Sequence, residues 1–173
     1  MWRAFASAGW AGEHALDDWS AAVLDDVARA AGATAYYPSD GPPYLPFQRW
    51  AMKAEPVRSS PLGILIHPDY GLWHGYRGAL AFTETLPLPP PDDRASPCET
   101  CADRPCLSTC PVGAFGEGGY DVPACAAHLR AQAGSDCMTL GCRARRACPV
   151  GRDYIYEAAQ AAFHMTAFLR ARG

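Results

Sequence analysis

The chain has 173 residues, 19% of them charged, and a formal net charge of -3 at pH 7. This length suffices for a compact domain with a buried core, so no disulfide scaffold is needed for stability. Charges of both signs are spread along the chain without a polybasic run, which argues against nucleic acid as a partner. No apolar run approaches the roughly 20 residues that span a bilayer, and Glu13 and His14 come too early for a signal peptide. We therefore expect a cytoplasmic protein that binds no membrane.

The N-terminal part of the chain predicts helices and short strands. Apolar residues recur at helical spacing from Leu16 to Ala31, and Gly32 follows where a helix would end. The ATAYY run at 33–37 is rich in residues that favour strands, and residues 46–54 begin with a proline suited to the first turn of a short helix.

Two further apolar runs, at 62–66 and 79–83, are expected strands joined by an aromatic loop. Asp40 lies in the sequence SDGPP and is interpreted as a turn residue, because aspartate before glycine is common turn chemistry.

Prolines mark the main boundary of the chain. The segment at 87–97 cannot hold a helix or a central strand, because proline lacks an N–H donor and has a fixed φ. We expect it to link a small α/β region at 1–86 to a cysteine-rich module at 98–152, followed by a C-terminal helix at 153–173. The expected fold class is therefore α+β. The inward stripe predicted for the terminal helix comprises Ile155, Ala159, Ala162, Phe163 and Ala167.

All eight cysteines fall between Cys98 and Cys148. A disulfide framework belongs mainly to secreted domains and spreads its cysteines over the parts that it ties together. This clustering instead predicts a local cysteine-lined site in a reducing compartment. Zinc also takes four cysteines, but its structural sites usually present two CxxC pairs, and this chain has one. Zinc and disulfides remain the alternatives to iron–sulfur clusters.

The spacing CxxCxxxxCxxxCP, from Cys98 to Pro111, favours a 4Fe-4S cluster, and the tetrapeptide CPVG recurs at Cys148. In two-cluster bacterial ferredoxins the cysteine before the proline ligates the other cluster. We therefore predict two 4Fe-4S clusters that exchange these ligands. The first is held by Cys98, Cys101, Cys106 and Cys148, and the second by Cys110, Cys125, Cys137 and Cys142.

The residues around the cysteines suggest how the backbone serves the clusters. Each CP pair is expected to begin a helical turn, since proline suits the first turn of a helix. Gly113, Gly141 and Gly151 are expected to supply left-handed backbone or close approach near the sulfurs.

Basic side chains also lie close to the ligands in sequence. Arg143, Arg145 and Arg146 are interpreted as a solvated helix face; the functional alternative is that they raise a cluster's reduction potential or dock an acidic electron donor. His128 lies one helical turn after Cys125 and is interpreted as a surface histidine.

The aromatic loop carries the other functional-looking side chains. His67, Tyr70, Trp73 and Arg77 are candidates to bind a planar cofactor or substrate, with Arg77 as an anion clamp. The alternative, which we favour, is that the loop packs beside the first cluster and shields it from water. No catalytic residue is assigned.

The stretch LGILIHPDYGLWHGYRGALAFTETLPLPP, followed by CETCADRPCLSTCPVGAF, resembles part of the epoxyqueuosine reductases, which are cobalamin-dependent iron–sulfur enzymes. The resemblance covers about residues 45–152 and implies two 4Fe-4S clusters with the crossed ligation, beside an α/β layer related to flavin nitroreductases. The chain reads EPVRSSPLG where those reductases carry a glycine-rich Gly-Lys-Asn segment that contacts the corrinoid. Most of their upstream corrinoid-binding chain is also missing, so cobalamin catalysis is not carried over.

These observations predict an iron–sulfur electron-transfer protein that passes single electrons to a redox partner protein, a small-molecule acceptor or a bound cofactor. The first alternative is a cobalamin- or flavin-dependent reductase with a substrate site at the aromatic loop. The second is an interaction module whose clusters are structural.

Overall fold

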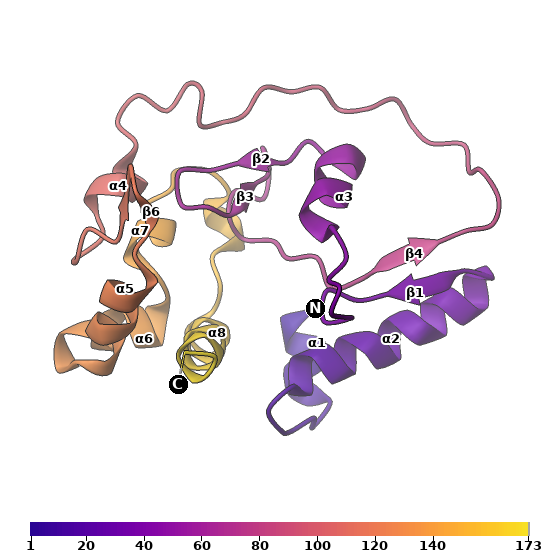
Figure 1. Cartoon of the computed structure of the whole chain (residues 1–173), viewed down its shortest axis with the longest axis horizontal. Helices are drawn as coiled ribbons and strands as arrows, with labels where there is room; N and C mark the ends of the chain where they lie inside the picture. Colours follow the sequence, from indigo (N-terminus) through magenta and orange to yellow (C-terminus); the bar gives the residue numbers. More distant parts are fainter. Residues whose placement is uncertain (173) are drawn as a thin grey trace. The chain divides into compact units, whose positions relative to one another are not determined.

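The computed structural model describes residues 1–172 (Figure 1). The chain divides into two compact units that are interleaved in sequence. The first unit comprises residues 1–54 and 75–91. The second, which we call the cysteine unit, comprises residues 55–74 and the chain from Asp92 onward. The boundaries expected from the sequence follow chain order, whereas here the segment 55–74 packs with the cysteines.

The first unit combines three helices with a two-stranded antiparallel sheet. Its elements are α1 (Trp2–Ser7), α2 (Ala15–Ala31), β1 (Thr34–Tyr36), α3 (Phe47–Ala54) and β4 (Ala79–Ala81). Helix α2 lies along the β1–β4 pair (Figure 1), and Leu16 and Ala28 on this helix are buried. The expected helices at 16–31 and 46–54 are confirmed. Gly32 ends α2 in the left-handed conformation, with φ 64°.

The β-rich run at 33–37 does form a strand, and Asp40 is the turn residue expected. The Asp40 carboxylate accepts a hydrogen bond of 2.8 Å from the Tyr37 N–H, and the Asp40 N–H donates to the Tyr37 carbonyl at 3.1 Å. The two bonds close the turn on itself.

The apolar runs at 62–66 and 79–83 both contain strand residues, as expected, but these strands do not pair with each other. Strand β4 pairs with β1, with Ala35 opposite Leu80, whereas β3 (Leu65–Ile66) pairs with β2 (Arg58–Ser59). The two runs belong to different units. An apolar run identifies a strand but does not choose its partner, because pairing depends on contacts that are distant in sequence.

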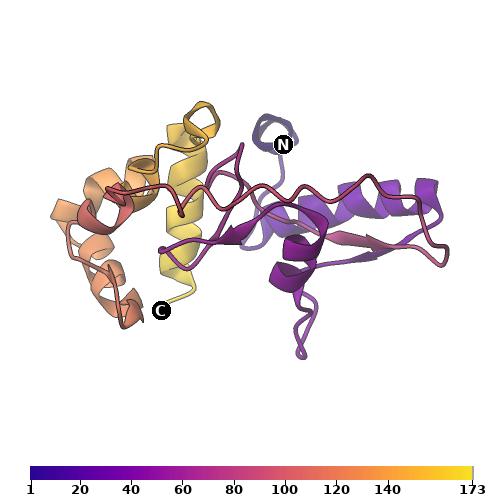
Figure 2. The same cartoon turned by 90° about the horizontal axis from the view of Figure 1, so that it is seen from above.

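The cysteine unit consists of short elements connected by turns. In chain order after β2 and β3 they are α4 (Pro105–Ser108), β5 (Phe115–Gly116), β6 (Gly119–Tyr120), α5 (Val122–Arg130), η1 (Gln132–Gly134), α6 (Ser135–Leu140), α7 (Arg143–Arg146), η2 (Arg152–Tyr154) and α8 (Ala158–Arg170). Strands β5 and β6 form a hairpin in which Phe115 faces Tyr120. Helix α8 packs on α6 and stands beside the short helices (Figure 2). Helices and small antiparallel sheets together make this an α+β protein, as expected.

The C-terminal helix starts later than expected, and its predicted inward stripe is wrong at Ile155 and Ala159, whereas Ala162, Phe163 and Ala167 are half-buried. Residues 152–154 form the 3-10 helix η2, and α8 begins only at Ala158. Ile155 and Ala159 are exposed, whereas Gln160 and Ala161 are the buried residues of α8. The non-helical residues between η2 and α8 change the helical phase. A stripe predicted for one continuous helix therefore does not match the face that α8 buries.

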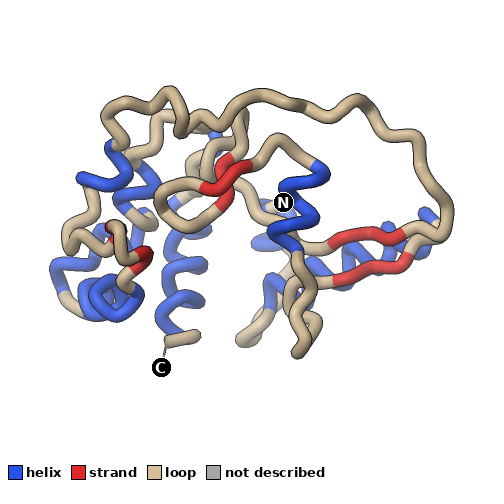
Figure 3. The backbone as a smooth tube through the Cα atoms, turned by 45° about the horizontal axis from the view of Figure 1, so that its top comes forward, coloured by secondary structure: helices blue, strands red, loops and turns tan. Residues whose placement is uncertain are grey.

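Residues 87–97 contain no helix or strand, as their prolines predict, and run as loop in Figure 3. Nearly all of this segment is exposed; Ser96, next to the first cysteine, is buried. No helix within residues 1–172 has the length and apolar character needed to cross a membrane.

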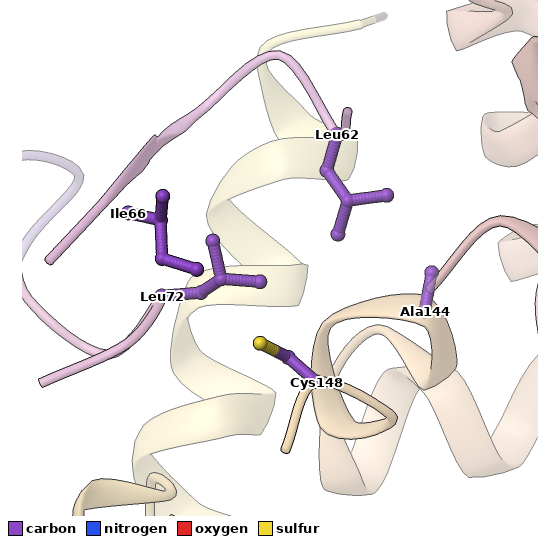
Figure 4. Close-up of a cluster of buried hydrophobic side chains, with 5 residues drawn as sticks. All are labelled: Leu62, Ile66, Leu72, Ala144 and Cys148. Carbon is purple, nitrogen blue, oxygen red and sulfur yellow. The ribbon is translucent and has the colours of Figure 1, made fainter. Parts of the chain in front are cut away.

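The core of the cysteine unit contains a cysteine. Leu62, Ile66, Leu72 and Ala144 pack with Cys148, which is 8% exposed. In Figure 4 the Cys148 sulfur points toward Leu72, on the aromatic loop. The segment 55–74 therefore supplies the apolar wall against which the cysteine region folds.

Candidate metal centre

One group of cysteines surrounds a small apolar hollow. It consists of Cys98, Cys101, Cys106 and Cys148, which we call the first cysteine set, and these residues line the hollow together with Ile66 and Val150. Three of the cysteines come from the segment around α4, and the fourth follows α7, more than 40 residues later in the chain. The hollow's other lining residues are mostly apolar, among them Pro61, Pro97 and Pro149, and they include Arg104.

A second group lines a larger cavity of about 350 Å³. It consists of Cys110, Cys125, Cys137 and Cys142, which we call the second cysteine set. Cys110 comes from the first CPVG sequence, Cys125 from α5, Cys137 from α6, and Cys142 directly precedes α7. Phe115, Leu129 and Phe168 provide apolar walls. Each hollow is thus lined by three cysteines from one half of the region and one cysteine-proline position from the other.

The cysteine-proline positions do not begin helices, contrary to expectation. Pro111 and Pro149 each start a turn, and the turns end at Gly113 and Gly151, with φ 58° and 71°. In the first, the Gly113 N–H donates to the Cys110 carbonyl at 3.2 Å. Proline fits the second position of a turn as well as the first turn of a helix, since both need φ near -65°.

The expected left-handed glycines are confirmed, since Gly113, Gly141 and Gly151 all have positive φ. At Gly151 there is a second reason for glycine. A Cβ there would lie 2.4 Å from the carbonyl carbon and oxygen of Tyr70, and a Cβ on Gly71 would lie 2.1 Å from the Val150 carbonyl oxygen. The absence of side chains allows the backbone of the aromatic loop to touch the turn that follows Cys148.

The thiols of both sets interact within their own set. Burial raises the pKa values of Cys98 and Cys106, and the nearby Cys148 and Cys101 raise them further. In the second set burial raises the pKa values of Cys125 and Cys142, with Cys137 adding to both. Metal binding deprotonates thiols, so a bound cation would reverse these shifts.

Hydrogen bonds also reach the sulfurs. The Ala114 N–H donates to the Cys110 Sγ at 3.3 Å. Burial raises the pKa of the Cys125 thiol, and the nearby Tyr120 hydroxyl opposes that rise. Burial also raises the pKa of the Cys142 thiol, and the backbone of Arg145 and Ala144 opposes it. Donors aimed at sulfur are a regular means of tuning thiolate-bound iron.

His128 is not the surface histidine expected from the sequence. It lines the cavity of the second cysteine set, and its Nε2 is buried without a hydrogen-bond partner among the described residues. Its position three residues after Cys125 on α5 was the available signal, because residues three apart share a helix face.

The three arginines are not a uniform solvated face either. Arg145 stacks on two rings, 4.4 Å from the Trp73 centroid and 4.6 Å from that of Tyr156, and its guanidinium donates to the Leu72 carbonyl. Arg146 pairs with Asp136 and is 26% exposed. Only Arg143, 49% exposed and also paired with Asp136, fits the expectation.

The aromatic loop packs within the cysteine unit. His67 is buried, and its Nδ1 accepts hydrogen bonds from the N–H groups of Asp69 and Tyr70. The Tyr70 ring lies 4.9 Å from that of Tyr154, and Trp73 lies 5.2 Å from Tyr156. These contacts fit the interpretation that the loop serves packing, since its rings contact Tyr154 and Tyr156 in the segment that follows Cys148.

Arg77, the fourth candidate for cofactor binding, lies in the other unit. Its Nη1 pairs with Asp17 at 3.1 Å, beside Tyr37 and Tyr76. The proposed cofactor-binding set is therefore divided between the two units: His67, Tyr70 and Trp73 belong to the cysteine unit and Arg77 to the other. The guanidinium expected to bind a ligand anion is paired with the Asp17 carboxylate.

Each of the eight cysteines is a free thiol. Within residues 1–172, no group of three or more histidine, cysteine, aspartate or glutamate side chains is placed to hold a metal ion. Comparisons with family models, curated proteins and solved structures give no match.

Proposed function

We propose that the chain is a one-electron transfer protein that carries two 4Fe-4S clusters, one on each cysteine set. The observation that carries the proposal is the division of eight cysteines between two apolar hollows, four lining each. The division follows the crossed pattern of a two-cluster ferredoxin, in which each cysteine before proline serves the other cluster. The proposed layout of the cysteine region is accordingly ferredoxin-like.

The donor sets fit clusters in chemistry and surroundings. Four thiolates are the standard ligands of a 4Fe-4S cluster, and a four-iron cluster spreads them around a body larger than one ion. Most residues that line the two hollows are apolar, and the Ala114 N–H donates to the Cys110 sulfur of the second set. When bound, such clusters accept and release single electrons; the protein sets the potential through hydrogen bonds, charge and burial.

Of what the resemblance to epoxyqueuosine reductases implies, this proposal uses only the two iron–sulfur clusters. Leu72, on the aromatic loop, packs with Cys148 in the cysteine unit, which includes residues 62–74 of the stretch that carries the resemblance, whereas residues 75–90 belong to the first unit. A redox partner protein or a small-molecule acceptor completes the electron path. No corrinoid or flavin chemistry is proposed for the chain.

The test is anaerobic reconstitution with iron and sulfide, followed by iron quantitation and low-temperature EPR before and after dithionite. The expected result is about eight irons per chain, broad absorption near roughly 400 nm and EPR signals of reduced 4Fe-4S clusters. Stoichiometric zinc without iron would refute the proposal. Clusters that dithionite does not reduce, and whose removal unfolds the domain, would instead favour a structural role.

A further inference from the structure

The first unit carries an apolar groove whose lining contains neither cysteines nor charged side chains. The groove has a volume of about 530 Å³ and is lined by Tyr36, Leu45, Trp50, Ala79, Leu80 and Ala81. Tyr36 and Trp50 are each 37% exposed, so both rings present surface to solvent. Phe47 supports the Trp50 ring from within α3, with ring centroids 5.2 Å apart. Aromatic-lined grooves of this kind are the usual binding sites of proline-rich segments.

The sheet that forms one wall of this groove is thinly covered. It has only two strands, β1 and β4, and none of their residues is buried. A two-stranded pair is marginally stable in water unless it packs against another element. Contacts in the groove would therefore add to the packing that α2 gives to β1.

A proline-rich segment follows the same sheet. Residues 86–91 read LPLPPP, which we call the proline arm, and they form no helix or strand. Leu86 is 42% exposed, and Leu88, at 81%, is the most exposed of the large apolar residues within 1–172. Prolines hold such a segment in the extended polyproline conformation, so little conformational entropy is lost when it binds.

The arm does not fill the groove of its own chain, since none of its residues is among those that line the groove. It begins five residues after Ala81, which is part of the groove wall, and four of its six residues are proline. Binding within one chain would require residues 82–85 to reverse the chain direction, because a proline-rich segment is too stiff to turn back. The groove and the arm are therefore both open to a partner.

Charges beside the arm and beside the groove are complementary. Glu84 lies two residues before the arm and Asp93 two residues after it, and both are exposed. Arg49 and Lys53 are exposed on α3, on either side of Trp50 in sequence, and their spacing of four places them on one helix face. Opposite charges around an apolar contact favour the matching partner and fix its register. An arm of this chain's own sequence fits the groove on this ground.

We propose that the groove binds the proline arm of a second copy of this chain, with Leu88 as the apolar anchor against Tyr36 and Trp50. Each copy offers one arm and one groove, so the contact forms twice about a two-fold axis. Once the first arm is bound, the second contact is intramolecular and therefore strengthens the dimer. This inference goes beyond the proposed electron transfer and does not depend on it.

The test is sedimentation velocity of the reconstituted full chain over a range of protein concentrations, with reductant present so that the free cysteines form no disulfides between chains. The mass of the parent protein is expected to rise toward that of two chains. Leu88→Lys should weaken the dimer by about tenfold or more, because it removes the anchor and adds a positive charge near Arg49 and Lys53. Val27→Lys is the matched control and should leave the dimer unchanged, because Val27 is 47% exposed on α2 and does not line the groove.

Mixing two variants tests the exchange itself. Leu88→Lys has a defective arm and Trp50→Ala a defective groove, so each alone should be mainly monomeric, whereas the mixture regains a dimer through one intact arm and one intact groove. If circular dichroism shows that Trp50→Ala is unfolded, Lys53→Glu at an exposed position takes its place.

Three results would overturn the proposal: a parent protein that is monomeric at every concentration, a Leu88→Lys variant that dimerises like the parent, or a mixture that stays monomeric. Loss of the dimer in Val27→Lys would also count against it, since the interface would then lie elsewhere. Iron quantitation on the same samples tests the proposed function separately.

Discussion

Gly151 and Tyr70 lie in backbone contact, close enough that a single added carbon on Gly151 would come within 2.4 Å of the Tyr70 carbonyl. We expect Gly151→Ala to lower the free energy of unfolding by about 3 kcal/mol or more, because it adds a clash to the strain of a left-handed alanine. Urea unfolding followed by tryptophan fluorescence measures the change.

Gly113→Ala is the matched control for this position. Gly113 ends the other CPVG turn with φ 58°, but nothing lies within 4 Å of an added Cβ. Its cost should be only about 1–2 kcal/mol, that of the left-handed conformation. Equal losses in the two variants would show that the contact with Tyr70 carries no weight.

Crossed ligation predicts an unusual pattern of iron loss in double cysteine variants. Cys106→Ala/Cys148→Ala removes two ligands from the first set and should leave about four irons on the second. Cys106→Ala/Cys110→Ala removes one ligand from each set and should leave neither cluster intact. Ligation without the exchange reverses the two results, so iron quantitation of this pair of variants decides between the arrangements.

Arg145 connects the aromatic loop to the chain around the last cysteine. We expect Arg145→Lys to destabilise the cysteine unit by about 1–2 kcal/mol, because lysine cannot stack its charge on both Trp73 and Tyr156 and still donate twice to the Leu72 carbonyl. Arg143→Lys, at a half-exposed position, should change stability by less than about 0.5 kcal/mol. Thermal unfolding of both reconstituted variants makes the comparison, and a neutral Arg145→Lys would contradict it.

Tyr37 predicts a loss of stability at alkaline pH in the first unit. Burial and the hydrogen bond to Asp25 raise the pKa of Tyr37 to about 12. A raised native pKa means that the folded state holds the proton more tightly, so this stability is complete below about pH 10 and is lost as pH rises through about 12. Ultraviolet titration of the parent protein against Tyr37→Phe identifies this phenol. Ionisation near pH 10 in the difference spectrum would contradict the prediction.

Local signals predicted local features, and long-range contacts account for the failures. The helix ending at Gly32, the turn at Asp40 and the left-handed glycines follow from residue chemistry within a few positions. The partners of β3 and β4 were not predicted, because a strand pattern does not identify the strand with which it pairs. The CP turns failed because proline fits a helix start and a turn equally well.

The candidate site shows the same division. Cysteine spacing, combined with the crossed ligation known from two-cluster ferredoxins, predicted the two sets of four that line the two hollows. The partial burial of His128 and Arg145 was missed because it depends on cavity walls and rings contributed by segments far along the chain. Arg143, Arg145 and Arg146 lie close together in the sequence and therefore look like a solvated helix face. Only the structure shows that Arg145 stacks on aromatic rings.

The position of Cys148 has a consequence for biosynthesis. Three cysteines of the first set leave the ribosome well before the fourth, and Cys148 also fills the core against Leu72 and Ile66. Because chains emerge N-terminus first, neither the first hollow nor its apolar wall can close until translation has passed this residue. A nascent chain therefore exposes these thiols together with the unburied side chains of Leu72 and Ile66. Under the proposed function, cluster insertion and completion of the core would be a single late event.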